Sequence, residues 1–486
     1  MKICLMADLH LSYNKSTIQY EICDWAFDQI AKDAPGLLLV PGDITTDGNM
    51  DAMTYFFKKL RSCAIPYVTV MGNRDVGDPA TAEEICKMAS PIKNRICGLD
   101  IVAINAPYRK MDDEARAFLA SGEDADIIVT HFPPQSSHHD DKPLFLEWLD
   151  NHPDTVVFSG HLHREEHNGN CHLIRALDPD KSVGASPCIT YYDTDTKEFS
   201  HVSYDCPLPD DWFDYLGLSC YKIETDSAFA AKHNMPVMEL RENVFKEDEA
   251  TIVRCVEEWR KAGGKMLSMH VDDICWDNGT IVPDPLLAER IQLANKLKVD
   301  QITQHTPSDL LMGQYSPDKV DALAASLGEY YKELRKEAVI AIENKHADEG
   351  DPIGDERQYG IIPCEVIEFM HALQKHVDQR VGVRLDVGHA VNNPPHSHRY
   401  TQGVWYSEVG KYVVGYHIHQ VTNDHGLENH YPIRNVYDEV MSYASFFRWW
   451  NEGKLNKAPL IMEMRPRNSY EISMETFLRQ RDEQSE

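Results

Sequence analysis

The 486-residue sequence predicts an α/β protein of two domains, the second of which is a (β/α)8 barrel. Two observations predict this fold class. In the first part of the chain, short apolar runs of the kind that buried strands use each end in aspartate, asparagine or histidine. From Tyr215 onward, eight apolar strands alternate with helical segments over about 270 residues, which is the number and size of a (β/α)8 barrel. The length also exceeds that of one ordinary hydrophobic core.

The opening run, Lys2 to Ala7, is typical of a buried strand and ends in Asp8-Leu9-His10. Residues two apart point the same way in an extended chain, so Asp8 and His10 leave the strand end together. Four later runs end alike, with Asp43 after Gly36–Val40, Asn73 after Pro66–Met71, His131 after Ile127–Thr130, and His161 and His163 after Thr155–Phe158. Each fragment occurs by chance in many chains, but five in order indicate a site at the carboxyl ends of a parallel sheet.

This series resembles the signature of the calcineurin-like metallophosphoesterases, which runs D-x-H, G-D, G-N-H-D, H and G-H-x-H, over roughly residues 1 to 205. The resemblance implies a two-sheet α/β sandwich, and the expected strands Cys171–Ala176 and Cys188–Asp193 fit a second sheet. It also implies two metals, one held by Asp8, His10, Asp43 and His163, the other by Asp43, Asn73, His131 and His161. A bridging carboxylate such as Asp43 suits two cations that polarise a phosphoryl group and supply hydroxide. The mixed oxygen and nitrogen donors suit Mn, Fe or Zn.

The third block departs from the family, because Arg74 stands where a histidine is usual. Arginine stays protonated at neutral pH and cannot donate and recover a proton, whereas its planar fork can bind phosphate. We therefore expect Arg74 to contact phosphate, ahead of the alternative that it only pairs with Asp75. The catalytic residues expected in this domain are Arg74, His131 and Asp43.

The strands expected in the second half lie near 215–221, 237–242, 265–272, 301–305, 339–344, 381–387, 413–419 and 459–464. Helical stretches fall between most of them, including Glu249–Ala262, Asp284–Leu297 and Asp318–Glu337. Imidazoles and carboxylates gather at seven places at the later strand ends, where such barrels keep their active sites. These residues are His270, His305, Glu343, Asp386 with His389, His417, Glu428 with His430, and Glu463.

This half, about residues 213 to 470, resembles the xylose-isomerase-like (TIM) barrel superfamily and, within it, endonuclease IV. The resemblance implies a central metal held by Glu343, Asp386, His417 and Glu463, with Glu343 also acting in catalysis. It further implies a cluster of two or three Zn (or Mn) completed by His270, His305, His389, Glu428 and His430. The family's D-x-H is E-x-H here, a conservative ligand change. Its H-L-N-D is His417-Ile418-His419-Gln420, which leaves the role of His419 open.

Composition limits the partners and the compartment. Lys+Arg 48 against Asp+Glu 78 gives a net charge of −30, which argues against broad binding to nucleic acid or anionic membranes but leaves room for a local basic groove. No apolar run approaches the ~20 residues that a membrane span needs. A site residue at position 8 argues against a cleaved signal peptide, and twelve scattered cysteines without a C-x-x-C indicate reduced thiols. We therefore expect a cytoplasmic protein.

Together these features predict a metal-dependent phosphoester hydrolase with domains 1–205 and 213–486 joined by a linker, 206–212. The expected substrate is a small phosphorylated molecule, such as a nucleotide or a sugar phosphate, or a nucleic-acid end. The alternative for the barrel is a sugar isomerase or epimerase with a single metal. A catalytically inactive binding module is disfavoured, because both ligand sets look nearly complete. The substrate, the metal and the oligomeric state stay open.

Overall fold

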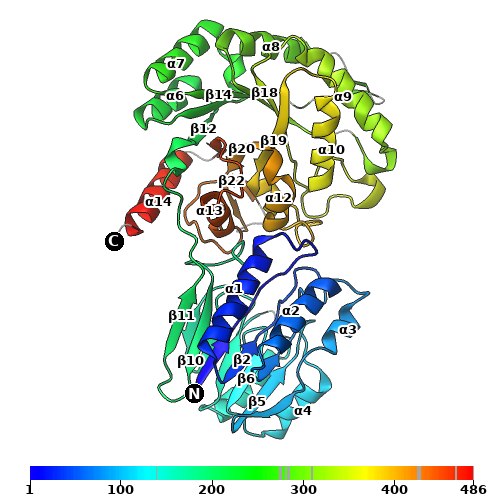
Figure 1. The fold of residues 1–486 in the computed structure, drawn as a ribbon, viewed down its shortest axis with the longest axis vertical. Coiled ribbons are helices and arrows are strands. Elements are labelled where there is room, and N and C mark those ends of the chain that lie inside the picture. The colour runs from blue at the N-terminus through cyan, green and yellow to red at the C-terminus, as the bar shows by residue number, and fades with distance from the viewer. Residues whose placement is uncertain are drawn as a thin grey trace. The chain divides into compact units, whose positions relative to one another are not determined.

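The computed structural model describes residues 1–486 except 138–139, 272, 274–275, 278–279, 282–284, 308–309, 424–427, 466–467 and 485–486. The chain forms two compact units, Met1–Cys206 with Asn435–Arg448, and Pro207–Arg434 with Trp449–Glu486. The first is a two-sheet α/β sandwich and the second a closed barrel of eight parallel strands, which confirms the predicted fold class (Figure 1). The domain limits 1–205, 206–212 and 213–486 stay a prediction, and nothing in the sequence indicated that 435–448 joins the first unit.

The first unit contains one sheet of five strands and one of six. The five-stranded sheet has the order β11-β10-β1-β2-β3. Its strands are β1 (Lys2–Leu5), β2 (Leu37–Val40), β3 (Tyr67–Thr69), β10 (Cys188–Asp193) and β11 (Phe199–Ser203). The six-stranded sheet has the order β4-β5-β6-β7-β9-β8. Its strands are β4 (Lys93–Ile96), β5 (Leu99–Ile104), β6 (Ile127–Thr130), β7 (Val156–Ser159), β8 (Glu166–Asn168) and β9 (Cys171–Leu173).

The core of this unit lies between the two sheets. Alternate residues of each strand face it, such as Ile3 and Leu5 of β1 and Ile127 and Val129 of β6, as the two-residue repeat of a strand requires. The other faces are covered by helices (Figure 1). These helices are α1 (Ile18–Asp33), α2 (Met50–Ser62), α3 (Ala82–Cys86), α4 (Asp113–Ser121) and α5 (Lys142–Asn151). Because both faces of the central strands are buried, those strands are apolar throughout, which explains the continuous runs in the sequence.

The two late strands do not share a sheet, so that part of the expectation was wrong. β9 runs parallel to β7 in the six-stranded sheet, whereas β10 runs antiparallel to β1 in the other. The β8–β9 hairpin turns the chain back beside β7, and β10 then pairs the edge of β1 that β2 leaves open. Each late strand thus satisfies the backbone groups of a different edge.

The barrel strands follow the order β12-β13-β14-β17-β18-β19-β20-β23. They are β12 (Leu216–Cys220), β13 (Val237–Leu240), β14 (Met266–His270), β17 (Gln301–His305), β18 (Val339–Glu343), β19 (Arg380–Asp386), β20 (Val413–Ile418) and β23 (Leu460–Met462). All eight coincide with the strands predicted from the sequence. Two short hairpins accompany them, β15–β16 (Trp276–Asp277 and Thr280–Ile281) and β21–β22 (Gln420–Thr422 and Glu428–Tyr431).

Helices surround the barrel strands on the outside (Figure 1). They are α6 (Ile223–Lys232), α7 (Glu249–Lys261), α8 (Pro285–Leu297), α9 (Pro317–Tyr331), α10 (Pro363–Gln374), α12 (Gln402–Val409) and α14 (Ser469–Glu483), while α11 (Val387–Val391) directly follows β19 and α13 spans Ala444–Asn451. Helix α9 ends six residues before the predicted Glu337. The Gln379 amide donates to the carbonyl oxygens of Tyr331 (3.0 Å) and Leu334 (2.7 Å), and so satisfies the acceptors that the end of the helix leaves free.

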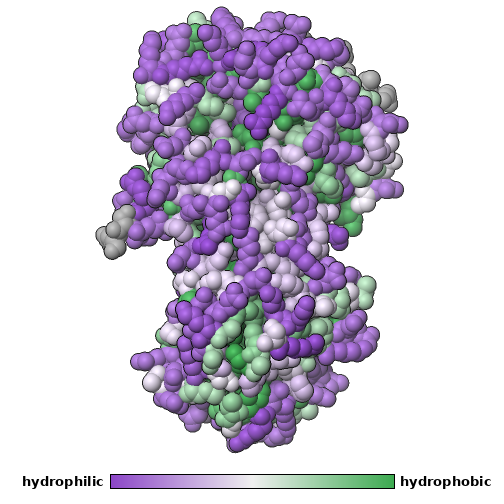
Figure 2. All heavy atoms as spheres, in the orientation of Figure 1, coloured by the Kyte–Doolittle hydropathy of each residue, from purple (hydrophilic) through white to green (hydrophobic). Residues whose placement is uncertain are grey.

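The surface agrees with the composition. The face in Figure 2 is mostly hydrophilic on both units, as a net charge of −30 predicts. Among the described residues, no helix is both long enough and apolar enough to cross a bilayer. Every cysteine among the described residues is a free thiol.

Candidate metal centres

The predicted ligands of the first unit lie where strands end and the backbone bends sharply. Five of them are in the left-handed region, which non-glycine residues rarely adopt. Their φ angles are 53° at Asp8, 48° at His10, 50° at Asp43, 75° at His161 and 56° at His163. Such strain costs on the order of 1–3 kcal/mol per residue and gathers at functional sites. Here it aims side chains from separate strands at one point.

All seven predicted metal ligands of this unit come together. Asp8, His10 and His163 form one group, and Asp43, His131 and His161 form a second; within each group the candidate ligand atoms lie within 4.8 Å of one another. Asp43 Oδ2 lies 3.3 Å from His10 Nε2 and 3.4 Å from His131 Nε2, so one oxygen faces both groups. Asn73 Oδ1 lies 3.1 Å from His131 Nε2. The structure thus brings the residues of both implied sets together, and their binding of metal stays a prediction.

Gly72, which precedes Asn73, makes room for Asp43. A Cβ atom at Gly72 would lie 2.1 Å from Asp43 Oδ1, closer than any real contact. The same oxygen accepts a hydrogen bond from the Arg74 backbone N–H at 2.8 Å. The glycine of the third block is therefore needed so that the second and third strand ends can meet.

The electrostatics of this centre favour bound cations. Burial and the charge of Asp43 raise the pKa of Asp8 to about 7, against an ordinary 3.8, although His131 opposes the shift. Burial lowers the pKa of His131, but the charges of Asp43 and Asp8 outweigh it and raise that pKa to about 9. The folded protein without metal thus holds protons among its buried carboxylates and imidazoles. Divalent cations would take the place of these protons, and the donor set fits them.

Asp75, the alternative partner expected for Arg74, is engaged elsewhere. Its buried carboxylate accepts from the backbone N–H and hydroxyl of Thr45 (2.8 and 3.1 Å) and from the Gly72 N–H (2.9 Å). Burial raises its pKa to about 6. These contacts give Asp75 a structural role in the strand-end turns, and the phosphate contact of Arg74 stays a prediction.

Asp178 was missed by the sequence analysis. Its Oδ2 lies 3.0 Å from His10 Nδ1 and therefore accepts the proton of that nitrogen, which leaves Nε2 facing Asp43. Such carboxylate–imidazole pairs orient metal-bound histidines. The available signal was the acidic pair in Asp178-Pro179-Asp180, close behind the His161/His163 block.

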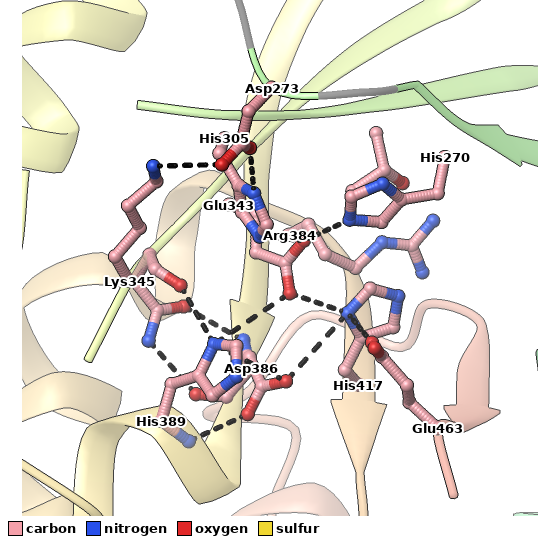
Figure 3. Close-up of polar contacts among 12 residues, drawn as sticks. His270, Asp273, His305, Glu343, Lys345, Arg384, Asp386, His389, His417 and Glu463 are labelled. Carbon is pink, nitrogen blue, oxygen red and sulfur yellow. Dashed lines mark hydrogen bonds and ion pairs between the residues drawn. The ribbon is translucent and has the colours of Figure 1, made fainter. Parts of the chain in front are cut away.

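The barrel centre is built around Glu343 at the end of β18 (Figure 3). Glu343, Asp386, His417 and Glu463 form a buried group whose candidate ligand atoms lie within 4.8 Å of one another. His417 Nδ1 lies 2.7 Å from Glu343 Oε1, 2.9 Å from Glu463 Oε2 and 3.8 Å from Asp386 Oδ2. Burial lowers the pKa of His417, but the charges of Glu343, Glu239 and Glu463 outweigh it and raise that pKa well above its ordinary value. This is the set that both interpretations of the barrel share.

Two further groups flank the central one and share its carboxylates. His270 and His305 meet Glu343 Oε2, at 2.8 and 3.2 Å from their Nε2 atoms. On the other side, Asp386 joins His389, His419 and His430. The Nε2 atom of His389 is buried and has no hydrogen-bond partner among the described residues, which is consistent with a nitrogen that binds a metal. Glu343 and Asp386 each belong to two groups, as bridging ligands do.

The predicted ligand Glu428 lies outside these groups, and His419 joins one instead. Glu428 is exposed, and its carboxylate accepts from the Tyr431 hydroxyl. His419 is buried, with Nε2 3.0 Å from Asp386 Oδ1 and Nδ1 accepting from the His430 N–H at 3.0 Å. A Cβ atom at Gly388 would lie 1.9 Å from His419 Cε1, so the glycine between Asp386 and His389 admits this ring.

Two carboxylates that support barrel histidines were also missed. Glu239 Oε1, at the end of β13, lies 2.7 Å from His417 Nε2. Asp273 Oδ1 lies 2.5 Å from His305 Nδ1, and Figure 3 shows Lys345 approaching the same carboxylate. The signal for Glu239 was a charged residue inside the apolar run Val237–Leu240. Such a residue needs a buried partner.

Comparison with known proteins agrees with the domain resemblances. Residues 1–165 match the family model described as calcineurin-like phosphoesterase, and residues 286–481 match that of the xylose isomerase-like TIM barrel. The chain joins a calcineurin-like phosphoesterase domain to a xylose isomerase-like barrel. A protein of Xenorhabdus bovienii named as a probable cyclic nucleotide phosphodiesterase is 25% identical over 205 residues, which are 35% of this chain and 82% of that protein. The prediction of a metal-dependent phosphoesterase is confirmed.

Solved structures resemble each part of this phosphoesterase–barrel chain. A dimetal phosphatase from Danio rerio is 11% identical, with 42% of this chain and 99% of that chain covered and a TM-score of 0.31. A xylose isomerase domain protein from Alicyclobacillus acidocaldarius is 12% identical, with 55% and 97% covered and a TM-score of 0.39.

Proposed function

We propose that the chain hydrolyses phosphoesters at two centres, a dinuclear one in the phosphoesterase domain and a multinuclear zinc one in the barrel. The observation that carries the first is the position of Asp43 Oδ2, which lies 3.3 Å from His10 Nε2 and 3.4 Å from His131 Nε2. A carboxylate oxygen between two histidine groups is the geometry of a bridging ligand. Bound there, two cations would polarise the phosphoryl group and supply hydroxide.

Within this centre, we assign the phosphate contact to Arg74. Its guanidinium can bind phosphate oxygens through two parallel N–H groups but cannot protonate a leaving group at neutral pH. Substrates whose leaving groups depart without a proton should therefore react best. Asp43 and His131 would hold the metals, against which the phosphoryl group would then lie.

The substrate we propose is a small phosphodiester or phosphomonoester, such as a nucleotide or sugar phosphate, or a nucleic-acid end. A nucleotide is favoured by the name of the Xenorhabdus bovienii relative, which shares the first domain. The net charge of −30 favours a small ligand over a long nucleic acid. A cytoplasmic location is part of the proposal and is supported by the free thiols of the described residues.

For the barrel, we propose a trinuclear zinc cluster with His419 as a ligand in place of Glu428. The support is that Glu343 and Asp386 each belong to two neighbouring donor groups. The second candidate is a sugar isomerase or epimerase with one metal, for which Glu343, Asp386, His417 and Glu463 would suffice. In that candidate, His270 and His305 would only line the sugar pocket.

Two single-site variants of the full chain test the proposal. Asp43→Ala should abolish hydrolysis at the first centre and Glu343→Ala hydrolysis at the second, while circular dichroism shows both variants folded. A screen of phosphodiesters and phosphomonoesters, with Mn²⁺ or Zn²⁺ supplied, assigns each activity to a centre. Wild-type turnover in Asp43→Ala on the Glu343→Ala background would contradict the first assignment. Aldose–ketose interconversion in the wild type, lost in Glu343→Ala, would favour the isomerase.

A further inference from the structure

The loop after β9, residues 174–183, is held against the predicted ligands of the first centre. The carbonyl oxygen of His163 accepts from the N–H groups of Ala176 (3.3 Å) and Val183 (3.4 Å). The carbonyl oxygen of Asp8 accepts from the Asp178 N–H at 2.9 Å. These hydrogen bonds, with one from the Lys181 N–H to the Asp178 carbonyl oxygen at 3.2 Å, hold the backbone of Lys181 in a loop beside the predicted ligands.

The two acidic neighbours of Lys181 are occupied by other donors. The Gln19 amide donates to Asp178 Oδ1 at 2.8 Å and to Asp180 Oδ2 at 2.7 Å. Oδ1 of Asp180 accepts a hydrogen bond from the Ser445 hydroxyl. Oδ2 of Asp178 lies 3.0 Å from Nδ1 of His10, a predicted ligand. Both carboxylates thus have their hydrogen bonds without the lysine.

The ammonium of Lys181 has neither a hydrogen bond nor an ion pair to any of the residues that the structure describes, although the side chain is only partly exposed. Burial and then the charge of Arg74 lower its pKa, while the carboxylates of Asp178, Asp43 and Asp180 oppose the shift. Its own charge contributes to lowering the pKa of His163, after burial and His10, and it also acts on His10. The lysine therefore lies within electrostatic reach of both Arg74 and the donor groups of the centre.

The two cations repel one another, the carboxylates of Asp178, Asp43 and Asp180 offset part of this repulsion, and an anion bound between the cations would offset more of it. We propose that Lys181 and Arg74 together bind the phosphoryl group of the substrate, so that Lys181 is a further substrate-binding residue of this centre. The inference rests on the proposed phosphoesterase function of the first domain. Because a phosphomonoester and inorganic phosphate carry more negative charge than a diester, Lys181 should contribute more to binding them.

The test compares Lys181→Met, which removes the charge and keeps the length, with Lys181→Arg, which keeps the charge. Lys58→Met, on the exposed face of α2, is the control. All are made in the full chain on the Glu343→Ala background, so that only the first centre acts. The measurements are KM and kcat for p-nitrophenyl phosphate and bis-p-nitrophenyl phosphate, the inhibition constant of inorganic phosphate, and the metal content.

A charge-assisted hydrogen bond contributes roughly tenfold or more to affinity. We therefore expect Lys181→Met to raise the monoester KM and the phosphate inhibition constant about tenfold, to raise the diester KM less, and to keep the metal content. Lys181→Arg should recover most of the affinity, and Lys58→Met should match the parent chain.

An unchanged inhibition constant of inorganic phosphate in Lys181→Met would overturn the inference. A loss of metal from Lys181→Met would also overturn it, because it would show that the lysine has a structural role. A parent chain inactive on every ester would instead refute the proposed function. In that case, calorimetric titration of phosphate into the Mn²⁺-loaded parent and Lys181→Met still decides the role of Lys181, since equal affinities would overturn it.

Discussion

Replacing Glu239 by glutamine should weaken metal binding in the barrel without unfolding it. Glu239 Oε1 lies 2.7 Å from His417 Nε2, and Oε2 accepts from the hydroxyls of Ser268 (2.7 Å) and Thr303 (2.8 Å). A carboxylate only accepts, so it fixes the proton of His417 on Nε2 and leaves Nδ1 for a metal. Glutamine keeps the shape but removes the charge that makes this imidazole a strong ligand.

Loss of such a supporting carboxylate costs about 10–100-fold in metal affinity, or roughly 1.4–2.8 kcal/mol. Competition with a zinc chelator, followed by elemental analysis of the chain, measures the change directly. Glu242→Gln is the matched control, because Glu242 lies three residues further along and its side chain is 45% exposed. If Glu239→Gln and Glu242→Gln both keep the zinc affinity of the parent within about twofold, Glu239 does not support His417.

Three further predictions concern the two centres. On an Asp43→Ala background, His270→Ala and His305→Ala should each lower both the zinc content of the chain and its phosphodiesterase rate. An unchanged zinc content in both variants would leave only the single-metal barrel. Arg74→Ala should mainly raise KM for activated esters, whereas an unchanged kcat/KM for every ester would give Arg74 a structural role alone. Once the metals are removed, the free energy of unfolding should fall as pH rises. The pKa values of about 7 at Asp8 and about 9 at His131 are both raised by folding, so the stripped protein gains stability from bound protons that is lost as pH rises through these values. EDTA should therefore lower the unfolding midpoint more at pH 9 than at pH 6, and an equal effect would contradict the shifts.

The barrel strands and the first-domain ligands could be predicted because one physical rule sets both. Parallel strands buried on two faces are apolar throughout, so a polar residue directly after such a run marks the open end of the sheet. Asp8 and Asp43 follow their strands in this way, as do Glu343 and Asp386 at the ends of β18 and β19. Position in the chain then gives position in space.

The rest depended on contacts between distant segments. Whether Glu428 or His419 faces Asp386 is decided by how the β21–β22 hairpin folds back and by the space at Gly388, which the spacing of residues does not reveal. Lys181 and Asp178 lie in a loop without apolar periodicity, so no strand or helix pattern placed that loop beside Asp8 and His163. Likewise, β10 joined β1 because that edge was open, and local sequence carries no record of a distant edge.

Elemental analysis of the purified, metal-replete full chain tests the two-centre hydrolase most directly. A dinuclear centre and a trinuclear cluster predict about five divalent metals per chain. Asp43→Ala should then lose about two of them and Glu343→Ala up to about three. About three metals in the parent chain, with Glu343→Ala losing only one, would contradict the trinuclear cluster and leave the barrel with the single metal of an isomerase.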